Sequence, residues 1–517
     1  MNWAPATLGA VLARQVRERP DAEALVTADE RLTYAALAVR AQAAAAAMRA
    51  LGLGKGDHVA VLMGNDAQWL TLFYGAALIG AVTVPVNTRF KTAELEYCLK
   101  QADCRALFYA ERFLNIDYGA MVGALGELPK LEHRIAVDRG WPENVPDREH
   151  SAPDGGADKP APQDLLLIQF TSGTTAYPKG VMLTHDAMLR NAFAAGTRIG
   201  VRAEDRYFNC RPFFHVGGST LSALVALGFG CTLVTLPTFE ARAALEFMER
   251  ERCTLTSGND TIFQMLMGHE DFPKRKLVLR GGWAAAGPQT VRRIIDVLGA
   301  REICIAYGLS EASPNVVIND WRDAEDLRVA GLAKPHDGTA VRIADPATLA
   351  VLPAGTRGEI QVHGWHLMRG YYNNPEASTQ AFTPDGWLRT GDLGEMTVDG
   401  RLRMVGRLKD VFRVGGENVA PAEVEEMLLA HPAVETAQAI GVPDARLGEV
   451  PCAYVTLKAG ARLTEAELLA WAKARAANFR VPRYLRIVPD FEAIGMTASG
   501  KVQKNRLREH ALREFGL

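Results

Sequence analysis

The chain has 517 residues, far more than the length at which a single hydrophobic core stops growing, so at least two domains are expected. Its hydrophobic fraction of 48% and charged fraction of 23% are ordinary for a globular enzyme, and a formal net charge of -2 excludes strong long-range attraction to nucleic acid. The seven cysteines are scattered without a C-x-x-C pair, which argues against a disulfide framework and a structural zinc site. This usage indicates a reducing compartment, and we expect a cytoplasmic protein.

The N-terminal stretch and two uncharged runs bear on membrane contact. Residues 1–25 predict a charged amphipathic helix without the apolar core of a signal peptide. The runs from Gln68 to Thr88 and from Val216 to Phe239 are long enough to resemble membrane spans. Each contains glycine and then switches to β-branched residues, which favours a buried helix followed by a buried strand. We expect no transmembrane segment, and the sequence leaves a peripheral membrane contact open.

From about Leu32 to Ile318, short apolar runs alternate with helical patterns rich in Ala, Leu and Arg. The runs include "HVAVLM", "RALFYA", "CTLTSG" and "REICIAYG". This alternation is typical of βαβ units and predicts an α/β fold with largely parallel sheets. The segment from Arg139 to Asp164, rich in Pro, Gly and Asp, interrupts the alternation and is expected to be a surface loop.

The sequence pattern changes after about Ala340. The segments "GEIQVHG", "GWLRTGDLG" and "DGRLRMVGR" predict a small β-rich subdomain. Past Lys409 the pattern is α+β, with one helix starting at Pro421 and another preceded by a capping box at Thr464 and Glu467. We therefore predict a large N-terminal domain over residues 1–408 and a small, mobile C-terminal domain over residues 409–517.

A strand-like run leads into "TSGTTAYPKG", a loop with the composition of a phosphate site. Its hydroxyl and glycine positions include Ser172, Gly173, Thr174 and Thr175. Glycine lets backbone N–H groups turn toward an anion, and Lys179 adds a mobile positive charge. The loop is not the common G-x-x-x-x-G-K-[ST] loop, because Pro178 and Gly180 occupy required Gly and Ser/Thr positions. The alternative interpretation is a turn that caps a helix beginning near Met182.

This loop closely resembles the signature of the adenylate-forming superfamily, which includes acyl-CoA synthetases, aryl-CoA ligases, luciferases and peptide-synthetase adenylation domains. The family pattern is [ST]-S-G-T-T-G-x-P-K-G, with Thr171 at its first position and Ala176 in place of the usual glycine. Further segments resemble the family in the same order: "FFHVGGS", "YGLSEAS", "GWLRTGDLG", "GRLKDVFRVGGENVAPAEVE" and "TASGKVQKNRLR". The resemblance thus covers nearly the whole chain.

The resemblance implies a reaction in two steps with ATP, Mg²⁺ and coenzyme A. A carboxylate is first joined to the α-phosphorus of ATP with release of pyrophosphate, and the acyl group then passes to a thiol. Two anions must meet in the first step, so cations and oriented dipoles are the main requirement. By resemblance, the loop from Thr171 to Lys179 holds the β- and γ-phosphates, and Glu311 is the Mg²⁺ ligand, a hard oxygen for a hard ion.

Other nucleotide contacts follow from the same resemblance. They are Gly282, Tyr307, Gly308, Ser310, Asp392 and Arg407. Tyr307 is expected to stack on adenine, and Asp392 with Arg407 to hold the ribose hydroxyls, since a carboxylate accepts two hydroxyl hydrogen bonds well. Gly282 belongs to a glycine pair along which adenine and the acyl group pack, and Ser310 lies near the α-phosphate.

The C-terminal motifs imply the remaining roles. Lys501 resembles the lysine that bridges the substrate carboxylate and the α-phosphate. It also completes an accidental G-x-x-x-x-G-K match, which we reject because Val502 follows where Ser or Thr is needed. Lys409 matches the hinge about which the small domain rotates between the steps. The loop that then lines the pantetheine tunnel is matched by Gly415, Gly416 and Glu417.

The identity of the acid is the least determined feature. Relatives that activate amino acids carry Asp where this chain has His215, so amino acids are disfavoured, because an unpaired ammonium in a dry pocket is costly. His215 is expected to act beside the carboxylate and the thiol tunnel; a packed structural histidine is the alternative. The expected acyl pocket includes Gly217, Gly218, Asn259, Asp260 and Trp283. We expect a medium-to-long aliphatic acid, with aryl or arylalkyl acids close behind.

The leading hypothesis is an acid–CoA ligase whose partners are ATP, CoA and a small carboxylic acid, without nucleic acid. A second is an enzyme that loads acyl groups onto a carrier protein, and a luciferase-type oxygenase shares every motif. A nucleotide-binding protein without catalysis is disfavoured, because Lys179, Glu311 and Lys501 are all retained. The sequence leaves a homodimer open.

Overall fold

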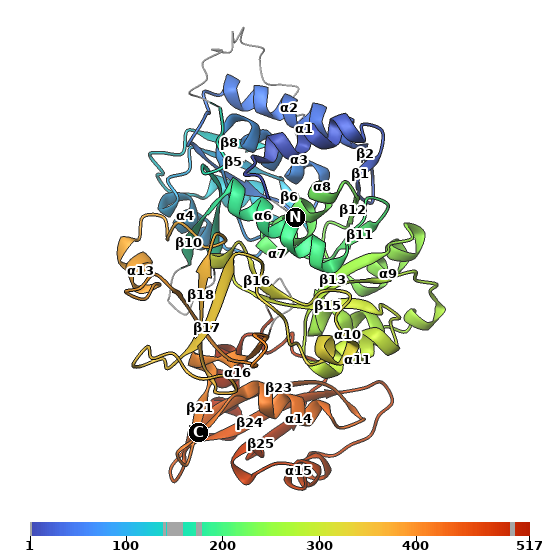
Figure 1. The fold of residues 1–517 in the computed structure, drawn as a ribbon, viewed down its shortest axis with the longest axis vertical. Helices are drawn as coiled ribbons and strands as arrows, with labels where there is room; N and C mark the ends of the chain where they lie inside the picture. The colour runs from blue at the N-terminus through green and yellow to red at the C-terminus, as the bar shows by residue number, and fades with distance from the viewer. Residues whose placement is uncertain (1–2, 138–140, 142–158, 172–177, 497–501) are drawn as a thin grey trace.

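The computed structural model describes residues 3–137, 141, 159–171, 178–496 and 502–517 (Figure 1). Two large sheets with their helices come first, a small β-rich unit follows, and an α+β unit ends the chain. In Figure 1 this last unit, orange to red, forms one end of the molecule, and the blue N-terminal helices lie toward the other. The predicted α/β class is confirmed.

The first sheet has the strand order β16-β15-β14-β13-β11-β12-β1-β2. Its strands are β1 (Glu23–Val26), β2 (Arg31–Thr33), β11 (Arg206–Asn209), β12 (Thr232–Thr235), β13 (Leu255–Asn259), β14 (Gly281–Ala285), β15 (Glu302–Gly308) and β16 (Asn315–Ile318). The strands from β1 to β15 pair in parallel, and the edge strands β2 and β16 pair antiparallel. The carboxyl ends of the parallel strands therefore meet at one edge, where α/β folds bind ligands.

The second sheet has the order β10-β9-β4-β3-β5-β8. Its strands are β3 (His58–Leu62), β4 (Val82–Pro85), β5 (Ala106–Tyr109), β8 (His133–Ala136), β9 (Leu165–Thr171) and β10 (Lys179–Thr184). Only β10 runs antiparallel to its neighbour. The alternative of a helix beginning near Met182 is therefore wrong. Residues 179–184 pair with β9, and helix α6 (His185–Ile199) begins only after Thr184, whose side chain accepts from Ala187 N.

Helices cover the faces of the two sheets (Figure 1). They include α1 (Leu8–Glu18), α2 (Tyr34–Ala50), α3 (Ala67–Ile79), α4 (Thr92–Gln101), α5 (Tyr118–Gly123), α6, α9 (Ala241–Arg250), α10 (Asp260–Gly268) and α11 (Pro288–Asp296). A two-stranded ribbon of β6 (Arg112–Phe113) and β7 (Ile116–Asp117) and the short turn η3 (Phe272–Lys274) lie in connections. All seven cysteines are unpaired and buried, so they serve packing rather than cross-linking.

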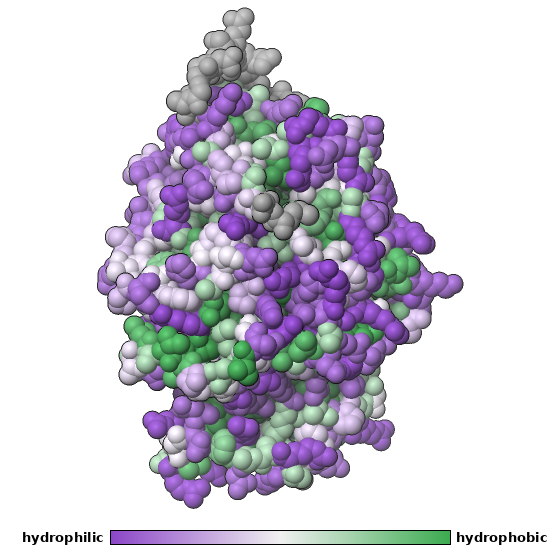
Figure 2. All heavy atoms as spheres, viewed as in Figure 1, coloured by the Kyte–Doolittle hydropathy of each residue, from purple (hydrophilic) through white to green (hydrophobic). Residues whose placement is uncertain are grey.

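Both uncharged runs are buried helix followed by buried strand, as predicted. In the first, α3 ends at Gly80, whose φ of 75° is left-handed, and β4 follows. In the second, α7 (Val216–Gly218), the π-helix η2 (Ser219–Leu224) and α8 (Val225–Phe229) lead through Gly230 to β12. No helix in the described part of the chain is both long and apolar enough to cross a membrane. The face in Figure 2 is mainly hydrophilic, with a hydrophobic patch at its lower left.

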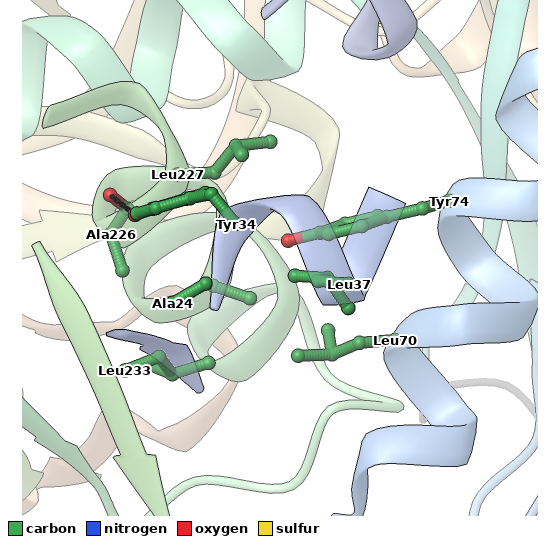
Figure 3. Close-up of a pocket in the computed structure, with 9 residues that line it drawn as sticks. Ala24, Tyr34, Leu37, Leu70, Tyr74, Ala226, Leu227 and Leu233 are labelled. Carbon is green, nitrogen blue, oxygen red and sulfur yellow. Dashed lines mark hydrogen bonds between the residues drawn. The ribbon is translucent and has the colours of Figure 1, made fainter. Parts of the chain in front are cut away.

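A small internal void lies between α2, α3 and α8 (Figure 3). Its volume is about 10 Å³, close to the space one water molecule needs. The lining is mainly alanine and leucine, and the Tyr34 hydroxyl donates to the carbonyls of Ala226 at 3.2 Å and Cys231 at 2.8 Å. The void is a feature of core packing rather than a ligand site.

The β-rich unit is an antiparallel meander. It consists of β17 (Thr339–Ala344), β18 (Gly358–Gly364), β19 (Leu388–Met396) and β20 (Leu402–Arg407), with α12 (Glu325–Val329) before it and α13 (Pro375–Gln380) within it. Asp392 of β19 pairs with Arg407 of β20 in the strand register. This pairing sets both side chains at the same level of the sheet.

The C-terminal unit has its own hydrophobic core. Its elements are η5 (Leu408–Asp410), β21 (Phe412–Val414), β22 (Glu417–Val419), α14 (Pro421–Leu429), β23 (Val434–Asp444), β24 (Gly448–Leu457), α15 (Glu465–Lys473), η6 (Asn478–Arg480), β25 (Tyr484–Ile487) and α16 (Lys504–Phe515). The buried apolar cluster contains no residue before Phe412. The predicted capping box is present, because Thr464 and Glu467 each accept from the other's backbone N–H. The domain limits 1–408 and 409–517 agree with this core and remain a proposal.

Candidate active site

The predicted phosphate loop joins β9 to β10. Thr171 and Lys179 pair with each other across the two strands, so they form the last strand pair before the connecting loop. Residues 172–177, with the predicted Ser172, Gly173, Thr174 and Thr175, lie outside the described residues, as does Lys501. Most of the predicted loop from Arg139 to Asp164 also lies outside them. The hairpin thus fixes only the two ends of the phosphate loop.

Lys179 and Glu311 come together through a tyrosine. The Tyr371 hydroxyl donates to Glu311 Oε1 at 2.9 Å, and Lys179 Nζ lies 5.0 Å from the centre of the Tyr371 ring. Glu311 belongs to the short turn η4 (Ser310–Ala312), which directly follows β15. The contact is held by backbone bonds from Met368 N to Glu311 O at 2.8 Å and from Met182 N to Gly370 O at 3.0 Å.

Burial and a neighbouring charge both affect the pKa of Tyr371. Burial, and then the neighbouring Glu311 carboxylate, raise the pKa of the Tyr371 hydroxyl well above its usual range. Tyr371 is therefore protonated at neutral pH and acts as a donor. A carboxylate has roughly four acceptor positions, so this one bond leaves Glu311 able to bind a cation as well.

Tyr307, Asp392 and Arg407 form a second polar group. The Tyr307 hydroxyl donates to Asp392 Oδ2 at 2.8 Å, and Arg407 Nε lies 3.4 Å from Asp392 Oδ1. Asp392 is only 3% exposed, whereas the Arg407 side chain is 50% exposed. Burial, followed by the charge of Asp392, raises the pKa of Tyr307. A buried carboxylate with an aromatic donor on one side and a mobile cation on the other is suited to binding neutral hydroxyl groups.

Two predicted glycines have no room for a side chain. A Cβ on Gly282 would stand 1.7 Å from Thr256 O, and its φ of 129° is left-handed. A Cβ on Gly308 would stand 2.0 Å from Pro314 O. Both glycines therefore allow backbone segments to approach closely, but only Gly308 lies at the carboxyl edge of the sheet, because Gly282 is near the start of β14. Gly308 ends β15, and Ser310 begins the turn that carries Glu311.

His215 lies at the start of the short helix α7. Its Nδ1 accepts from Gly217 N at 3.0 Å, which assigns the ring proton of the neutral imidazole to Nε2. A Cβ on Gly218 would stand 2.2 Å from Pro212 O, so this turn also requires glycine. The π-helix η2 follows immediately, and such helical irregularities are frequent at functional sites.

Two of the predicted acyl-pocket side chains are bonded to nearby backbone. Asn259 Oδ1 accepts from Ile262 N at 3.0 Å and caps α10. Asp260 Oδ1 accepts from Gly287 N at 3.1 Å, and burial raises the pKa of this carboxyl. Trp283 is buried and packs beneath the guanidinium of Arg211 at 4.6 Å. Trp283 lies in the same buried hydrophobic cluster as Leu221 of η2.

The residues predicted for the second step lie in the C-terminal unit. Lys409 is exposed in η5. Gly415 and Gly416 have φ values of 58° and 101° and form the exposed turn between β21 and β22, next to Glu417. Lys409, Gly415, Gly416 and Glu417 thus belong to exposed turns of the C-terminal unit, whereas Tyr307 and Glu311 lie on β15 and in the turn after it.

A cleft of about 450 Å³ separates the C-terminal unit from the rest of the chain. Its lining includes Arg357, Arg403, Glu423, Glu426 and Arg480. Within the described ranges, no three His, Cys, Asp or Glu side chains form a metal site. Glu311 alone fits a Mg²⁺ ion that arrives with ATP, because Mg²⁺ is commonly held by one or two carboxylates plus substrate phosphates.

Comparisons with family models and with curated relatives identify the family of this chain. The model for AMP-binding enzyme matches residues 12–372, and the model for the AMP-binding enzyme C-terminal domain matches residues 423–501. The YngI protein of Bacillus subtilis is 36% identical, with 99% of this chain and 98% of YngI covered. The mitochondrial medium-chain acyl-CoA ligase ACSF2 of Danio rerio is 32% identical, with 99% of this chain and 89% of the relative covered.

Solved structures show the same fold over the whole chain. The anthranilate CoA ligase AuaEII in complex with anthranoyl-AMP has a TM-score of 0.90 and 26% identity, with 100% of this chain and 99% of AuaEII covered. ATP-bound MatB from Rhodopseudomonas palustris has a TM-score of 0.84 and 28% identity, with 98% and 99% covered. The chain belongs to the AMP-binding enzyme family, and the predicted enzyme class, an AMP-forming acyl-CoA ligase, is confirmed.

Proposed function

We propose that this enzyme activates a medium-chain carboxylic acid with Mg-ATP and transfers the acyl group to coenzyme A as a thioester. The observation that supports it best is the placement of two polar groups at the carboxyl end of β15. Tyr307, in the last part of β15, donates to Asp392, and Glu311, in the turn that follows, accepts from Tyr371, whose ring lies near Lys179. The Danio rerio relative, 32% identical over nearly the whole chain, is a medium-chain acyl-CoA ligase, which supports this chain length.

Each residue of the site has a separate role in the first step. Asp392 accepts hydrogen bonds from the ribose hydroxyls, and Tyr307 fixes the carboxylate orientation. Lys179 and the loop before it neutralise the β- and γ-phosphates. Glu311 would hold a Mg²⁺ ion that arrives with ATP, and that ion would supply further positive charge. His215 donates from Nε2 toward the acid. Lys501 draws the carboxylate and the α-phosphate together, so that the carboxylate oxygen attacks phosphorus and pyrophosphate leaves.

The second step uses the C-terminal unit. Rotation at Lys409 removes Lys501 and brings the turn of Gly415, Gly416 and Glu417 to the acyl-adenylate. The thiolate of coenzyme A then attacks the acyl carbon, and AMP leaves. The described links between the two parts include partly exposed ion pairs, such as Arg293 with Glu435, which supports such a rotation. We also propose a cytoplasmic location, from the seven unpaired thiols.

An aryl acid is the second candidate substrate. The anthranilate CoA ligase AuaEII has a TM-score of 0.90 and supports it. Trp283 would shorten the acyl pocket and offer a ring for an aryl group to pack on.

Pyrophosphate release from Mg-ATP tests the proposal, with and without CoA, over aliphatic and aryl acids, with each thioester identified by mass. We expect a CoA-dependent acyl-CoA product from a medium-chain acid. Lys179→Met should slow pyrophosphate release by roughly a hundredfold, while the exposed Lys334→Met serves as the matched control. Acyl-AMP without thioester would support carrier-protein loading instead, and no turnover with any acid would refute the proposal.

A further inference from the structure

Arg211 is a buried cation beside the predicted acyl pocket. It lies two residues beyond the end of β11 and is 5% exposed. Its guanidinium carbon lies 4.6 Å from the centre of the Trp283 ring. Its Cδ lies 2.9 Å from the position that a Cβ on Gly217 would occupy, and His215 Nδ1 lies 3.1 Å from the same position. Arg211 therefore packs against Trp283 and Gly217, close to His215.

Among the described residues, the Arg211 guanidinium makes neither a hydrogen bond nor an ion pair, and its Nε is fully buried without a partner. Arg328 provides a direct comparison, because it is 7% exposed. Its guanidinium donates to the carbonyls of Asp323 at 3.1 Å, Arg301 at 2.7 Å and Ile303 at 2.8 Å. The other buried arginine of the described chain is thus satisfied, and Arg211 is the exception.

The unpaired state of Arg211 is unfavourable in the ligand-free protein. Burying a cation without a partner is costly, and the face of an aromatic ring offsets only part of the cost. Burial lowers the pKa of the guanidinium, which nevertheless stays charged. Core packing alone would be served as well by an apolar side chain. The backbone carbonyl of Arg211 does accept from Asn65 and Asn209, but any residue would provide that carbonyl.

Glycine at position 217 creates the space that Arg211 occupies. A side chain there would collide with Arg211 and His215. The π-helix η2 begins two residues later, and Leu221 of η2 lies in the same buried cluster as Trp283. The local chain is therefore shaped around a charged group that no anionic side chain in the described ranges neutralises.

We propose that Arg211 binds a second oxygen acceptor on the acyl part of the substrate. This inference rests on the proposed acid–CoA ligase function and narrows its substrate class. A carboxylate is the group that a buried guanidinium matches best, because it neutralises the charge and accepts two parallel hydrogen bonds. A keto oxygen offers the same acceptor chemistry without the charge. The preferred acid is then a dicarboxylic or keto acid rather than a plain fatty acid.

The test compares three sets of acids of equal length: plain monocarboxylic, keto-substituted and dicarboxylic acids. We measure kcat/KM for pyrophosphate release and, separately, equilibrium binding of each acid by calorimetry in the presence of AMP. The wild type should favour an acid with a second acceptor by about tenfold or more over its plain counterpart. Arg211→Met should abolish or reverse that preference, and Arg211→Lys should retain part of it for dicarboxylic acids only.

The variants separate the outcomes. Arg190 stacks on Trp365 at 4.2 Å away from these residues, so Arg190→Met controls for the loss of an arginine–tryptophan contact. A wild-type preference for plain acids in both turnover and binding would overturn the inference. An equal loss for all acids in Arg211→Met would also overturn it, because Arg211 would then serve the common carboxylate. Selective binding of a second acceptor without turnover would support the inference and count against the ligase function.

Discussion

At the scale of single residues, substitution of Asp392 provides the most specific test of nucleotide binding. Asp392 is buried, it accepts from Tyr307 at 2.8 Å, and Arg407 approaches it at 3.4 Å. If Asp392 holds the ribose, its charge strengthens hydrogen bonds that the ribose hydroxyls donate. A hydrogen bond to a charged group contributes about 1.5–3 kcal/mol. Removing that charge should therefore be visible in nucleotide selectivity as well as in rate.

We predict that Asp392→Asn raises the KM for ATP by roughly tenfold or more. The wild type should discriminate against ATP that lacks a ribose hydroxyl, and the variant should lose most of that discrimination. Steady-state kinetics with ATP and its 2′- and 3′-deoxy forms provide the measurement. Asp385→Asn, which breaks an exposed pair with Arg342, serves as the control. A variant that is slower but equally selective would show that Asp392 has only a structural role.

Tyr371 is predicted to position Glu311 and Lys179. Tyr371→Phe removes the hydroxyl that donates to Glu311 and keeps the ring beneath Lys179. We expect kcat/KM to fall about tenfold or more, with a higher Mg²⁺ concentration needed for half-maximal rate. The matched control is Tyr372→Phe, whose hydroxyl donates to Asp103. An unchanged Mg²⁺ dependence in Tyr371→Phe would contradict the positioning role.

The sequence alone predicts some of these residues and misses others. Tyr307 and Asp392 belong to motifs, and the structure brings them into contact. Tyr371 has no such signal, because its contacts with Glu311 and Lys179 exist only after the chain folds. Asn259 caps a helix, which its place before an apolar helical run would have indicated.

At the scale of elements, most strands and helices follow the local sequence pattern. The exceptions are segments whose structure depends on pairing or packing with other parts of the chain. The uncharged runs fold as expected because glycine ends each helix and β-branched residues begin each strand. Residues 179–184 become a strand because β9 offers an unpaired edge, a tertiary effect that no local pattern contains. The local sequence pattern also does not predict the π-helix η2, all six residues of which are buried.

The turn η5 is the element on which the two-step mechanism depends. Lys409 lies in this 3-10 turn, where a φ of about -60° is usual and compatible with proline. We predict that Lys409→Pro slows thioester formation far more than adenylation, because proline prevents the backbone rotation. Lys501→Ala should show the reverse pattern, losing adenylation but retaining thioester formation from supplied acyl-AMP. Equal loss of both steps in Lys409→Pro would count against the hinge.

At the scale of the whole molecule, the two parts of the chain are joined loosely. The links include Arg293 with Glu435 at 3.0 Å and Arg357 with Glu423 at 2.7 Å. Partly exposed pairs of this kind contribute only about 0.2–1 kcal/mol each. The separate core of residues 412–511 would keep the C-terminal unit intact during the proposed rotation. The change of composition and element pattern near residue 408 predicts a domain division there, which stays a prediction, whereas no sequence pattern indicates these contacts.

The stability of the whole molecule should depend on pH through buried histidines. Burial lowers the pKa of His185 and His366 to about 4 and that of His336 to about 3. In the unfolded chain these histidines have a pKa near 6.5, so their contribution to the free energy of unfolding is fully present above that pH. It is lost as the pH falls from about 6.5 toward 4, by at most about 1.4 kcal/mol per pH unit for each histidine.

Melting temperatures measured between neutral pH and pH 5 test this dependence. His366 has both ring nitrogens buried without a hydrogen-bond partner in the described chain, so His366→Leu loses no bond. This variant should lose less stability on acidification than the wild type does. The control is His510→Gln, because the His510 side chain is 40% exposed. This variant should leave the pH dependence of the melting temperature unchanged. A steeper dependence in His366→Leu would contradict the assignment.

The most direct test of the proposed mechanism is a single turnover followed by rapid quenching. Enzyme in excess is mixed with Mg-ATP labelled at the α-phosphate and the preferred acid, and CoA is added after the first phase. We predict that, without CoA, acyl-AMP accumulates up to the concentration of the limiting labelled ATP. On addition of CoA it should disappear as AMP and acyl-CoA form in equal amounts. Acyl-CoA that forms without prior acyl-AMP, or acyl-AMP that persists in the presence of CoA, would contradict the two-step ligase.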